Sequence, residues 1–431
     1  MFDAYRILMI IATSLKGLSF YCPSFKRLME SGPVIKPNWV HYFLTCTLLL
    51  LGPPAWSQKM DTVKNNKVAV SAIDVPAGLK TLPKTYVARH TNSVMKIDGK
   101  LTEPGWRQAP WTDEFVDILG ASIPSGESNL KKDGPNQILP TKVKMCWNDQ
   151  YLFVAAELTE PQLWGNLTKR DAIIYNDNDF ELFISPTGDT RNYFEIEVNA
   201  RGTILDLFMT KPYRNKGRAL ISWNAGGIKK AVTLYGTLNK PGDHDSLWSV
   251  EMAIPFTALQ LWPHKAMPTP EELWRINFSR VEWDLTVTDS GYTRKRDKYG
   301  SILAEHNWVW SPQGIKAMHA PERWGYLFFA RDESYHPQVA LSELQKNGLW
   351  QLYYLQEAYL HKNNSYALTL GDLGISGQHI KVGTGETEQL YSLKMEATSR
   401  QFQIDMISPE GQYLFSIDNT GQITTNHPFK R

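Results

Sequence analysis

Residues 179–199 read DFELFISPTGDTRNYFEIEVN, and they contain the clearest strand pattern of the chain. Apolar side chains occupy every second position in both of its halves, which is typical of strands with one buried face. The alternating apolar residues are Phe180, Leu182 and Ile184, then Phe194, Ile196 and Val198. Turn-forming residues, Pro186-Thr187-Gly188-Asp189, separate the halves. We therefore predict two antiparallel strands joined by a turn.

Strand patterns of the same kind continue on both sides of this stretch. They cover residues 151–158, 203–209, 231–238, 247–254 and 274–283. Many short strands with turns at this spacing predict a mostly β fold, an antiparallel β-sandwich of the immunoglobulin or jelly-roll kind. One short helix is expected directly after Pro255, where PFTALQL follows a strand.

The chain divides into four predicted segments. These are a signal or leader segment (1–57), a linker (58–88), the β-sandwich (89–331) and a small α+β C-terminal domain (332–431). In the last segment, residues 339–364 have apolar side chains at helical spacing, and Asn363-Asn364 should end that helix. Turn-forming residues in the remainder predict a small sheet packed on the helix.

The leader carries an export signal. Residues 42–51, YFLTCTLLLL, have the length of a signal-peptide core and are too short for a membrane span, which needs roughly 20 residues. Ala55-Trp56-Ser57 predicts cleavage before Gln58, and hence a secreted, periplasmic or cell-surface protein. Two alternatives are a true start at Met29 and a two-span membrane anchor that would also use the apolar patch at 7–15.

Charge and cysteine content exclude two classes of protein. The 431 residues carry a formal charge of +2, but residues 1–57 alone carry +3, which leaves −1 for the rest. No basic face remains to favour nucleic acid as a partner. The three cysteines cannot form a disulfide framework, because Cys22 and Cys46 lie in the leader and leave Cys146 alone.

No common enzyme motif is present: the chain has no G-x-S-x-G, H-E-x-x-H or P-loop. Glu181, Glu195 and Glu197 are carboxylates on predicted strands. A retaining glycosidase needs two carboxyl groups about 5–5.5 Å apart, which neighbouring strand positions can provide. Alternating glutamates are more typical of the solvated face of a half-buried sheet. A glycan-active hydrolase is therefore an alternative to a binding protein.

Aromatic and acidic residues supply candidate ligand sites. Trp164, Trp223, Trp308 and Trp310 fall in loop-like stretches, where exposed rings commonly mark a binding surface that could stack on sugars. The turn before residue 180 holds Asp177 and Asp179 beside two asparagines. Carboxylate and amide oxygens at such spacing suit Ca²⁺, although the turn does not match an EF-hand and such residues also shape turns without metal.

A set of segments in fixed order resembles a known family. They are IDGKLTEPGW (97–106), YLFVAAELTEP (151–161), IIYNDNDFELFIS (173–185), YFEIEVNARGTILD (193–206), WSVEMAIPFTAL (248–259) and WRINFSRVEW (274–283). Across about residues 85–330 their order and spacing resemble the family 9 carbohydrate-binding modules. The resemblance implies a β-sandwich, often with bound calcium, that binds a saccharide and accompanies xylanases and other polysaccharide-degrading enzymes.

The resemblance also implies a site, in which two aromatic rings clamp a terminal sugar beside a carboxylate, an arginine and an asparagine. The residues that match these motif positions are Tyr175 for the first ring, Glu181 (or Asp179) for the carboxylate, Arg201, Asn277 with Arg280 nearby, and Trp223 or Trp283 for the second ring. Tyr175 stands where tryptophan is typical. Insertions around 208–230 and 284–320 also exceed the compact module.

The C-terminal segment LYYLQEAYLHKNNSYA (352–367) weakly resembles the helix-to-loop junction of pseudopilin-like domains, although an ordinary amphipathic helix explains it equally well. A haem-binding relative of the sandwich would need an axial Met or His pair, and Met252 lies in a strand pattern as ordinary core. Three functions follow. The first is an exported protein that binds ends of plant or algal polysaccharides, with a polysaccharide-degrading enzyme as partner. The others are the hydrolase and a surface-assembly protein that has lost its ligand.

Overall fold

The computed structural model describes residues 74–120, 138–261, 267–269, 272–289, 291–332, 334–383 and 388–425. All of them belong to one compact unit, residues 68–431. The predicted leader, its cleavage site and most of the predicted linker lie outside the described residues, so export and the domain boundaries stay predictions. No helix in the described ranges is long and apolar enough to cross a bilayer.

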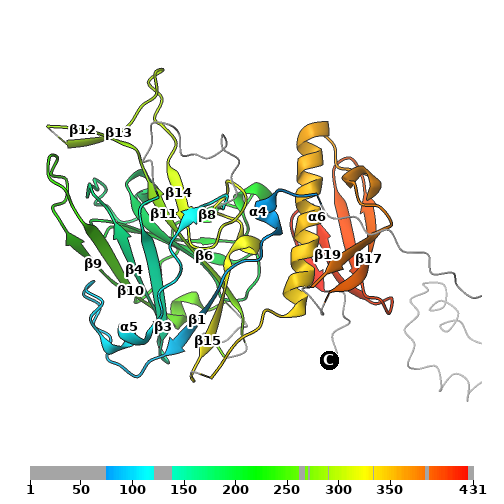
Figure 1. The fold of residues 1–431 in the computed structure, drawn as a ribbon, viewed down its shortest axis with the longest axis horizontal. Coiled ribbons are helices and arrows are strands. Elements are labelled where there is room, and N and C mark those ends of the chain that lie inside the picture. Colours follow the sequence, from blue (N-terminus) through cyan, green and yellow to red (C-terminus); the bar gives the residue numbers. More distant parts are fainter. Residues whose placement is uncertain are drawn as a thin grey trace, which may run out of the picture. The chain divides into compact units, whose positions relative to one another are not determined.

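Most of the described strands belong to one large sheet (Figure 1). In chain order they are β1 (Thr85–His90), β2 (Val116–Asp117), β3 (Thr141–Trp147), β4 (Tyr151–Thr159), β5 (Asp179–Ser185), β6 (Tyr193–Asn199), β7 (Ile204–Met209), β8 (Ala219–Leu220), β9 (Lys229–Tyr235), β10 (Leu247–Pro255), β11 (Trp274–Glu282), β14 (His306–Val309) and β15 (Gly325–Ala330). Their order is β8-β7-β6-β5-β11-β15-β1-β3-β4-β10-β9, with β14 beside β11 and β2 beside β14. β12 (Leu285–Thr288) and β13 (Gly291–Arg294) form a separate hairpin.

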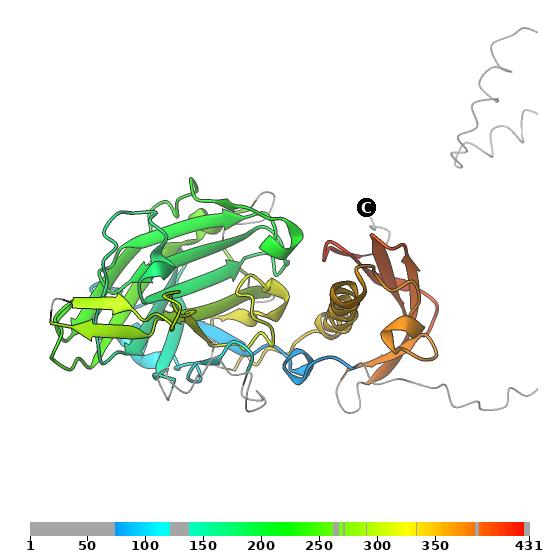
Figure 2. The same cartoon turned by 90° about the horizontal axis from the view of Figure 1, so that it is seen from above.

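The mostly β prediction is confirmed, whereas the purely antiparallel sandwich needs correction. β1 runs parallel to both β15 and β3, and thereby joins two antiparallel halves into one mixed sheet. β1 precedes both halves in the sequence and lies between them in the sheet. No hairpin joins it to β15 or β3, so nothing forces it to run antiparallel to them. Figure 2 shows the sheet curling so that its halves approach one another.

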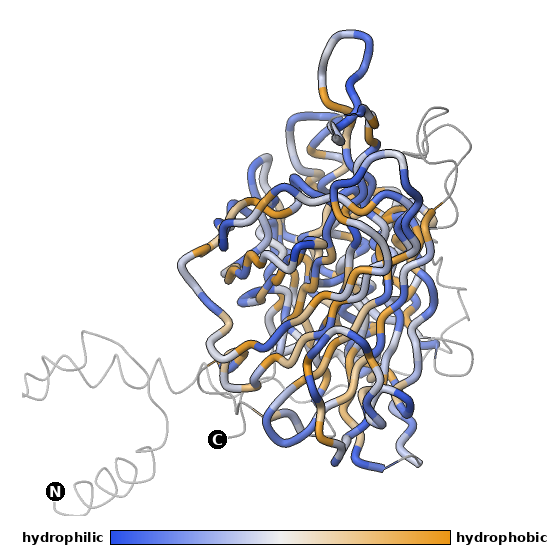
Figure 3. Tube along the Cα trace, turned by 90° about the vertical axis from the view of Figure 1, so that its left-hand side faces the viewer, coloured by the Kyte–Doolittle hydropathy of each residue, from blue (hydrophilic) through white to orange (hydrophobic). Residues whose placement is uncertain are grey.

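The core lies between the two halves of the curled sheet. Phe180, Leu182 and Ile184 of β5 pack in one cluster with Val154 of β4 and Met252 of β10. The alternation of apolar and polar residues along the strands is visible in Figure 3. The strands predicted between 151 and 283 are all present, and the short helix predicted after Pro255 is a 3-10 turn, η4 (Phe256–Leu259). Burial of apolar surface contributes about 25 cal/mol per Å² to folding, so burial of these side chains is the main favourable contribution to the stability of the fold.

Short helical segments connect the strands. They are α4 (Ala77–Lys80), α5 (Pro104–Gln108), η2 (Ile174–Asn176), η3 (Tyr213–Asn215) and η5 (Pro321–Arg323). α5 begins with Pro104, which needs no amide donor in a first helical turn. Two of these segments, η2 and η3, each supply a residue of the pocket described below.

The C-terminal part has the predicted helix and sheet. α6 (Leu341–Asn363) ends where Asn364 adopts a left-handed conformation with φ of 53° and donates its amide to Leu360 O. Five antiparallel strands follow, β16 (His379–Val382), β17 (Gln389–Ala397), β18 (Phe402–Ile407), β19 (Tyr413–Asp418) and β20 (Ile423–Thr425), with η6 (Gly371–Leu373) before them. Gly348 lets α6 approach the sheet, because a Cβ there would lie 3.2 Å from Ile380 Cδ1.

Candidate functional site

A row of carboxylates crosses β5 and β6 on the face opposite the main core. Glu181 pairs with Glu197 across these strands, and Phe183 pairs with Glu195. Side chains alternate between the faces of a strand, so Asp179 and Glu181 project from the face that Phe180 and Leu182 avoid. The register therefore gathers Asp179, Glu181, Glu195 and Glu197, which we call the acidic cluster.

The acidic cluster is buried, which corrects the expectation of a solvated strand face. Asp179 is 0% exposed, and the three glutamates are 3–5% exposed. Both carboxylate oxygens of Asp179, and one oxygen each of Glu181 and Glu195, have no hydrogen-bond partner among the described residues. Buried polar atoms nearly always have partners in folded proteins, so these oxygens mark a place where a ligand, ion or proton is needed.

Burial and mutual repulsion determine the charge of the acidic cluster. Burial, followed by the neighbouring Glu181 and Glu197 charges, raises the pKa of Asp179 well above its usual range. Burial also raises the pKa of Glu181 and of Glu195, and the Glu197 charge adds to both shifts. Burial raises the pKa of Glu197 to about 7, although the Tyr175 amide donates to its Oε2 at 3.0 Å and opposes the shift. Protons are therefore held in this cluster at neutral pH.

A pocket of about 590 Å³ opens over this cluster. Its volume lies in the range of about 300–1,000 Å³ that is usual for small-molecule sites. Two tyrosine rings line it, Tyr175 from η2 and Tyr213 from η3, and they are 43% and 49% exposed. Asn307 of β14 and His319, which precedes η5, add polar groups to the lining, together with Glu305 and Lys316.

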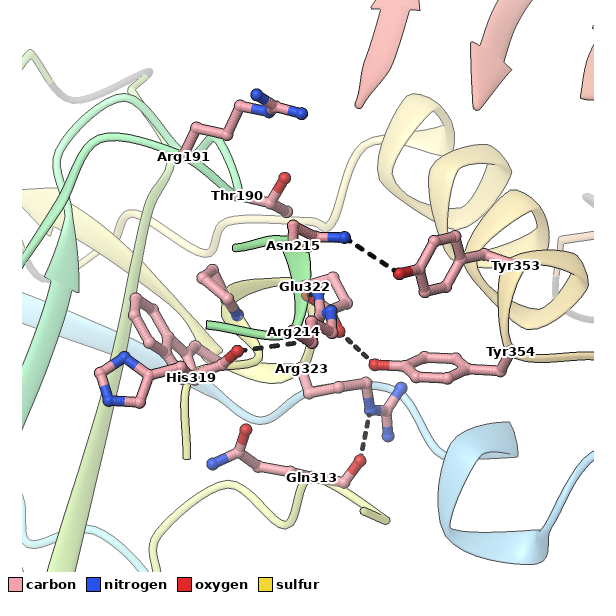
Figure 4. Close-up of polar contacts among 12 residues, drawn as sticks. Thr190, Arg191, Arg214, Asn215, Gln313, His319, Glu322, Arg323, Tyr353 and Tyr354 are labelled. Atoms are coloured by element: carbon pink, nitrogen blue, oxygen red, sulfur yellow. Dashed lines mark hydrogen bonds and ion pairs between the residues drawn. The ribbon is translucent and has the colours of Figure 1, made fainter. Parts of the chain in front are cut away.

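His319 is held on two sides at the edge of this pocket. Its Nδ1 lies 2.9 Å from Tyr193 Oη, and its Nε2 lies 3.6 Å from Glu195 Oε2. Burial, and then the Arg214 guanidinium, lowers the pKa of His319 to about 3, so the imidazole is neutral at pH 7. The contact with Glu195 is therefore not an ion pair. Figure 4 shows His319 beside Arg214, whose Nη1 donates to the His319 carbonyl at 3.4 Å.

Two residues that the family resemblance implies, Tyr175 and Glu181, lie together in the pocket. Two others lie outside it. The Arg201 Nε donates to Gly165 O at 2.7 Å and so fixes a loop. Asn277 is fully buried and exchanges two hydrogen bonds of 2.9 Å with the backbone of Ser311.

Arg280 also lies outside the pocket, in a second buried network. Its Nη2 contacts Glu160 at 2.7 Å and Glu282 at 2.8 Å, and its Nη1 donates to Thr159 O. Arg280 is 1% exposed, so a bound sugar could not reach it without a rearrangement.

The candidate second rings belong to the packing of the protein. The Trp223 ring lies 4.6 Å from Phe194, against the main core. Trp283 is 7% exposed and donates its Nε1 to the Tyr175 carbonyl at 2.8 Å, so it supports the first ring from behind. Trp164, Trp308 and Trp310 are likewise buried. Tyr213 is the exposed ring that accompanies Tyr175 in the pocket.

Sequence reasoning missed Tyr213, Asn307 and His319. Tyr213 and Asn307 fall within the insertions around 208–230 and 284–320, where no strand pattern ordered the residues. From the sequence, Glu195 and Glu197 have a role only in the hydrolase alternative, together with Glu181. Their strand alternation was the available signal, because it places both on the same face as Glu181 once the register is known.

The predicted calcium ligands separate in the structure. Asp177 Oδ2 accepts hydrogen bonds from the amides of Asn166 and Leu167 and from Asn199 Nδ2, at 2.8–2.9 Å, so it holds a loop. Asp179 instead forms a triad with Glu181 and Glu197, and one carboxylate oxygen of each lies within 4.8 Å of the others. Ca²⁺–oxygen distances are about 2.3–2.6 Å, so this triad fits a cation whereas Asp177 does not.

Comparisons with known proteins each match part of the chain. No protein-family model matches the chain. Exoglucanase XynX of Acetivibrio thermocellus is 28% identical over 187 residues, which are 43% of this chain and 14% of that enzyme. Endo-1,4-β-xylanase A of Thermoanaerobacterium saccharolyticum is 27% identical over 187 residues, 43% of this chain and 13% of the enzyme. The chain thus spans only about one seventh of the length of either enzyme.

A solved structure shows a distant likeness. It is a family 9 carbohydrate-binding module of Caldicellulosiruptor kristjanssonii in complex with cellotriose, 14% identical, with a TM-score of 0.36 over 60% of this chain and all of that one. The same module in complex with glucose gives a TM-score of 0.34 at 14% identity, over 59% of this chain and all of that one. The resemblance predicted from the sequence motifs is confirmed as a distant similarity to the family 9 carbohydrate-binding modules and to regions of the two enzymes.

Proposed function

We propose that the chain is a non-catalytic protein that binds a saccharide in the pocket over the acidic cluster. One observation carries the proposal: two half-exposed tyrosine rings, Tyr175 and Tyr213, line a pocket whose base holds carboxylates with unpartnered oxygens. Sugar rings present C–H faces that pack on aromatic rings. Sugar hydroxyls can both donate to a carboxylate and accept from a protonated one, so the cluster suits them in either state.

The class of ligand is inferred from the names of the two similar enzymes. The two similar enzymes are named for action on glucan and xylan, so ends of such polysaccharides are the first ligands to test. In an exported protein, such binding would support carbohydrate breakdown by a separate enzyme. The shallow, half-exposed rings favour weak binding, because few groups of the sugar would be fully desolvated.

Calorimetric titration of the chain with cello- and xylo-oligosaccharides tests this proposal. Tyr175→Ala and Tyr213→Ala should each weaken binding by about tenfold or more, since each loses a stacking surface. Tyr235→Ala is the matched control, because Tyr235 is 46% exposed on β9 outside the pocket. Equal affinity in all three variants would remove the pocket from the proposal. A blank glycan array with folded protein would favour the surface-assembly alternative.

The hydrolase alternative receives less support from the electrostatics. A glycosidase separates the pKa values of its two carboxyl groups, so that one is a proton donor and the other is ionised. Here burial raises the pKa of every member of the acidic cluster, and repulsion from neighbouring carboxylates adds to the shifts of Asp179, Glu181 and Glu195. Release of reducing sugar by the purified chain, abolished in Glu181→Gln, would reverse this conclusion.

We also propose that Ca²⁺ binds the triad of Asp179, Glu181 and Glu197 when these carboxylates are ionised. Their unpartnered oxygens and their spacing within 4.8 Å support it. Calcium titration at pH 8, followed by calorimetry and thermal shift, should show binding that Asp179→Asn abolishes. Asp177→Asn is the comparison, since Asp177 contacts amides instead of the triad. Saccharide titrations with and without EDTA show whether sugar and cation use the pocket together.

A further inference from the structure

The C-terminal helix α6 reaches two loops of the large sheet through a shared carboxylate. Glu322 of η5 accepts a hydrogen bond from Tyr354 Oη of α6 at one carboxylate oxygen. Its other oxygen accepts from Arg214 Nη2 of η3 at 2.7 Å. The Glu322 side chain is 0% exposed, so neither contact is replaced by water. Figure 4 shows the three groups together.

A second contact ties η3 to the same helix. The Asn215 Nδ2 donates to Tyr353 Oη at 3.1 Å. The Arg214 guanidinium lies over two rings of α6, 5.4 Å from the centroid of Trp350 and 5.9 Å from that of Tyr353. Residues three and four apart lie on one helix face, so Trp350, Tyr353 and Tyr354 present one aromatic surface to η3.

The loops that α6 contacts are the loops that carry pocket residues. Tyr213 directly precedes Arg214, and Arg214 also donates to the carbonyl of His319 at 3.4 Å. The Tyr213 and His319 rings contact each other edge to face, with centroids 4.5 Å apart. His319 in turn lies 3.6 Å from Glu195 of the acidic cluster. Contacts therefore run without a break from α6 to the pocket.

We propose that α6 supports the binding pocket from outside its lining, with Tyr353 and Tyr354 as positioning residues that hold Tyr213 and His319 in place. The ligand side of this inference rests on the proposed saccharide binding, whereas the positioning of His319 does not. If the C-terminal domain only followed the sheet in sequence, its helix would not be expected to place a tyrosine hydroxyl on each of the two loops that carry pocket residues.

Hydrogen-bond deletions in the full chain test the inference without removing any domain. Tyr354→Phe and the double variant Tyr353→Phe/Tyr354→Phe keep the rings and lose only the hydroxyls. Tyr366→Phe is the matched control, because Tyr366 Oη donates to Glu357 Oε1 at 3.1 Å, a tyrosine–glutamate contact inside the C-terminal part. The His319 imidazole is followed by NMR titration, with His319→Gln to assign its signal among the ten histidines.

In the double variant we expect the His319 signal to shift and its pKa to rise from about 3 toward 6.5, because the ring gains access to water. The groups that face it are Glu195, Tyr193, Tyr213 and Arg214. Saccharide affinity should fall roughly three- to tenfold, comparable to the net weight of one hydrogen bond, because the deleted hydroxyls act on the pocket only through η3 and η5. Tyr366→Phe should change neither quantity.

An unchanged His319 titration in the folded double variant, or the same change in Tyr366→Phe, would overturn the inference. A shifted His319 signal with lowered saccharide affinity supports both claims. A shifted signal in a protein that binds no saccharide even in its wild-type form supports the positioning by α6 and contradicts the proposed function. The two failures are therefore distinguishable.

Discussion

Two buried groups of carboxylates lie at the neighbouring residues Asn178 and Asp179. They differ in whether their oxygens have hydrogen-bond partners. Asn178 donates from Nδ2 to Glu282 at 2.8 Å and to Glu160 at 3.2 Å, and Arg280 contacts both of these glutamates. Asp179, the next residue, instead enters the acidic cluster, where its two oxygens have no partner among the described residues. We call the first group the paired network. Adjacent strand positions face opposite ways, which separates the groups.

The difference between the groups distinguishes stability from function. In the paired network a guanidinium and an amide give both glutamates hydrogen-bond partners, although burial still raises the pKa of Glu282 to about 8. The acidic cluster instead leaves oxygens of Asp179, Glu181 and Glu195 without a partner among the described residues, beneath a pocket. A family motif that includes both Glu181 and Arg280 hides this division.

The largest expected effect comes from breaking the paired network. Arg280→Met should lower the free energy of unfolding by about 3–5 kcal/mol, because it leaves Glu160 and Glu282 buried without a cation. Urea denaturation at pH 7 measures the loss. Arg201→Met is the control, with an expected change below about 1 kcal/mol, since Arg201 is exposed and bonds one carbonyl. Equal losses in both variants would contradict the contrast between a paired and a surface arginine.

The strand pattern predicts which carboxylates share a face. The separation of Arg280 from the pocket depends on contacts between residues far apart in the sequence. The alternation in residues 179–199 predicts both strands and the shared face of Glu181 and Glu197, and the motif puts Tyr175 beside them. The same motif gives no means of separating Arg280 from the pocket, because its partner Glu160 is 120 residues away. Tyr213 and His319 come from insertions, and the Tyr193–His319 contact spans 126 residues. Only the folded sheet brings them together.

Removing one charge from the acidic cluster should have a smaller effect of opposite sign. Burial raises the pKa of Glu197 from 4.5 to about 7 in the folded protein, so the folded state binds more protons than the unfolded state between these values. Stability is therefore expected to fall as pH rises from about 4.5 to 7 and to level off above 7. Glu197→Gln stays neutral and should be more stable than the wild type at pH 8 by up to about 3 kcal/mol.

Denaturation curves at pH 4.5 and pH 8 measure this effect. Near pH 4.5 the variant and the wild type should differ little, because Gln can still accept the Tyr175 amide that Glu197 accepts. Glu396→Gln is the control at a side chain that is 72% exposed. A Glu197→Gln variant that is no more stable at pH 8 would mean that a bound cation or another group already compensates the cluster.

The smallest expected effect lies where the two groups meet. Trp283 follows Glu282 of the paired network, its amide donates to Asn178 Oδ1 at 2.8 Å, and its Nε1 donates to the carbonyl of Tyr175 at 2.8 Å. Trp283→Phe keeps the backbone contact and an aromatic ring but loses the Nε1 donor. One neutral hydrogen bond contributes about 0.5–1.5 kcal/mol, so saccharide affinity should fall roughly two- to tenfold with a modest change in stability.

The pattern of losses decides whether the paired network supports the pocket or only the fold. For Trp283→Phe and for Arg280→Met, the loss of saccharide-binding free energy is divided by the loss of unfolding free energy. The two resulting ratios are then compared. If the paired network acts on the pocket through Trp283, the tryptophan variant loses more affinity per unit of stability than the arginine variant does. Arg280 is not among the residues that line the pocket, whereas Trp283 contacts the backbone of Tyr175 directly. Equal ratios would mean that both residues act on binding only by stabilising the sheet.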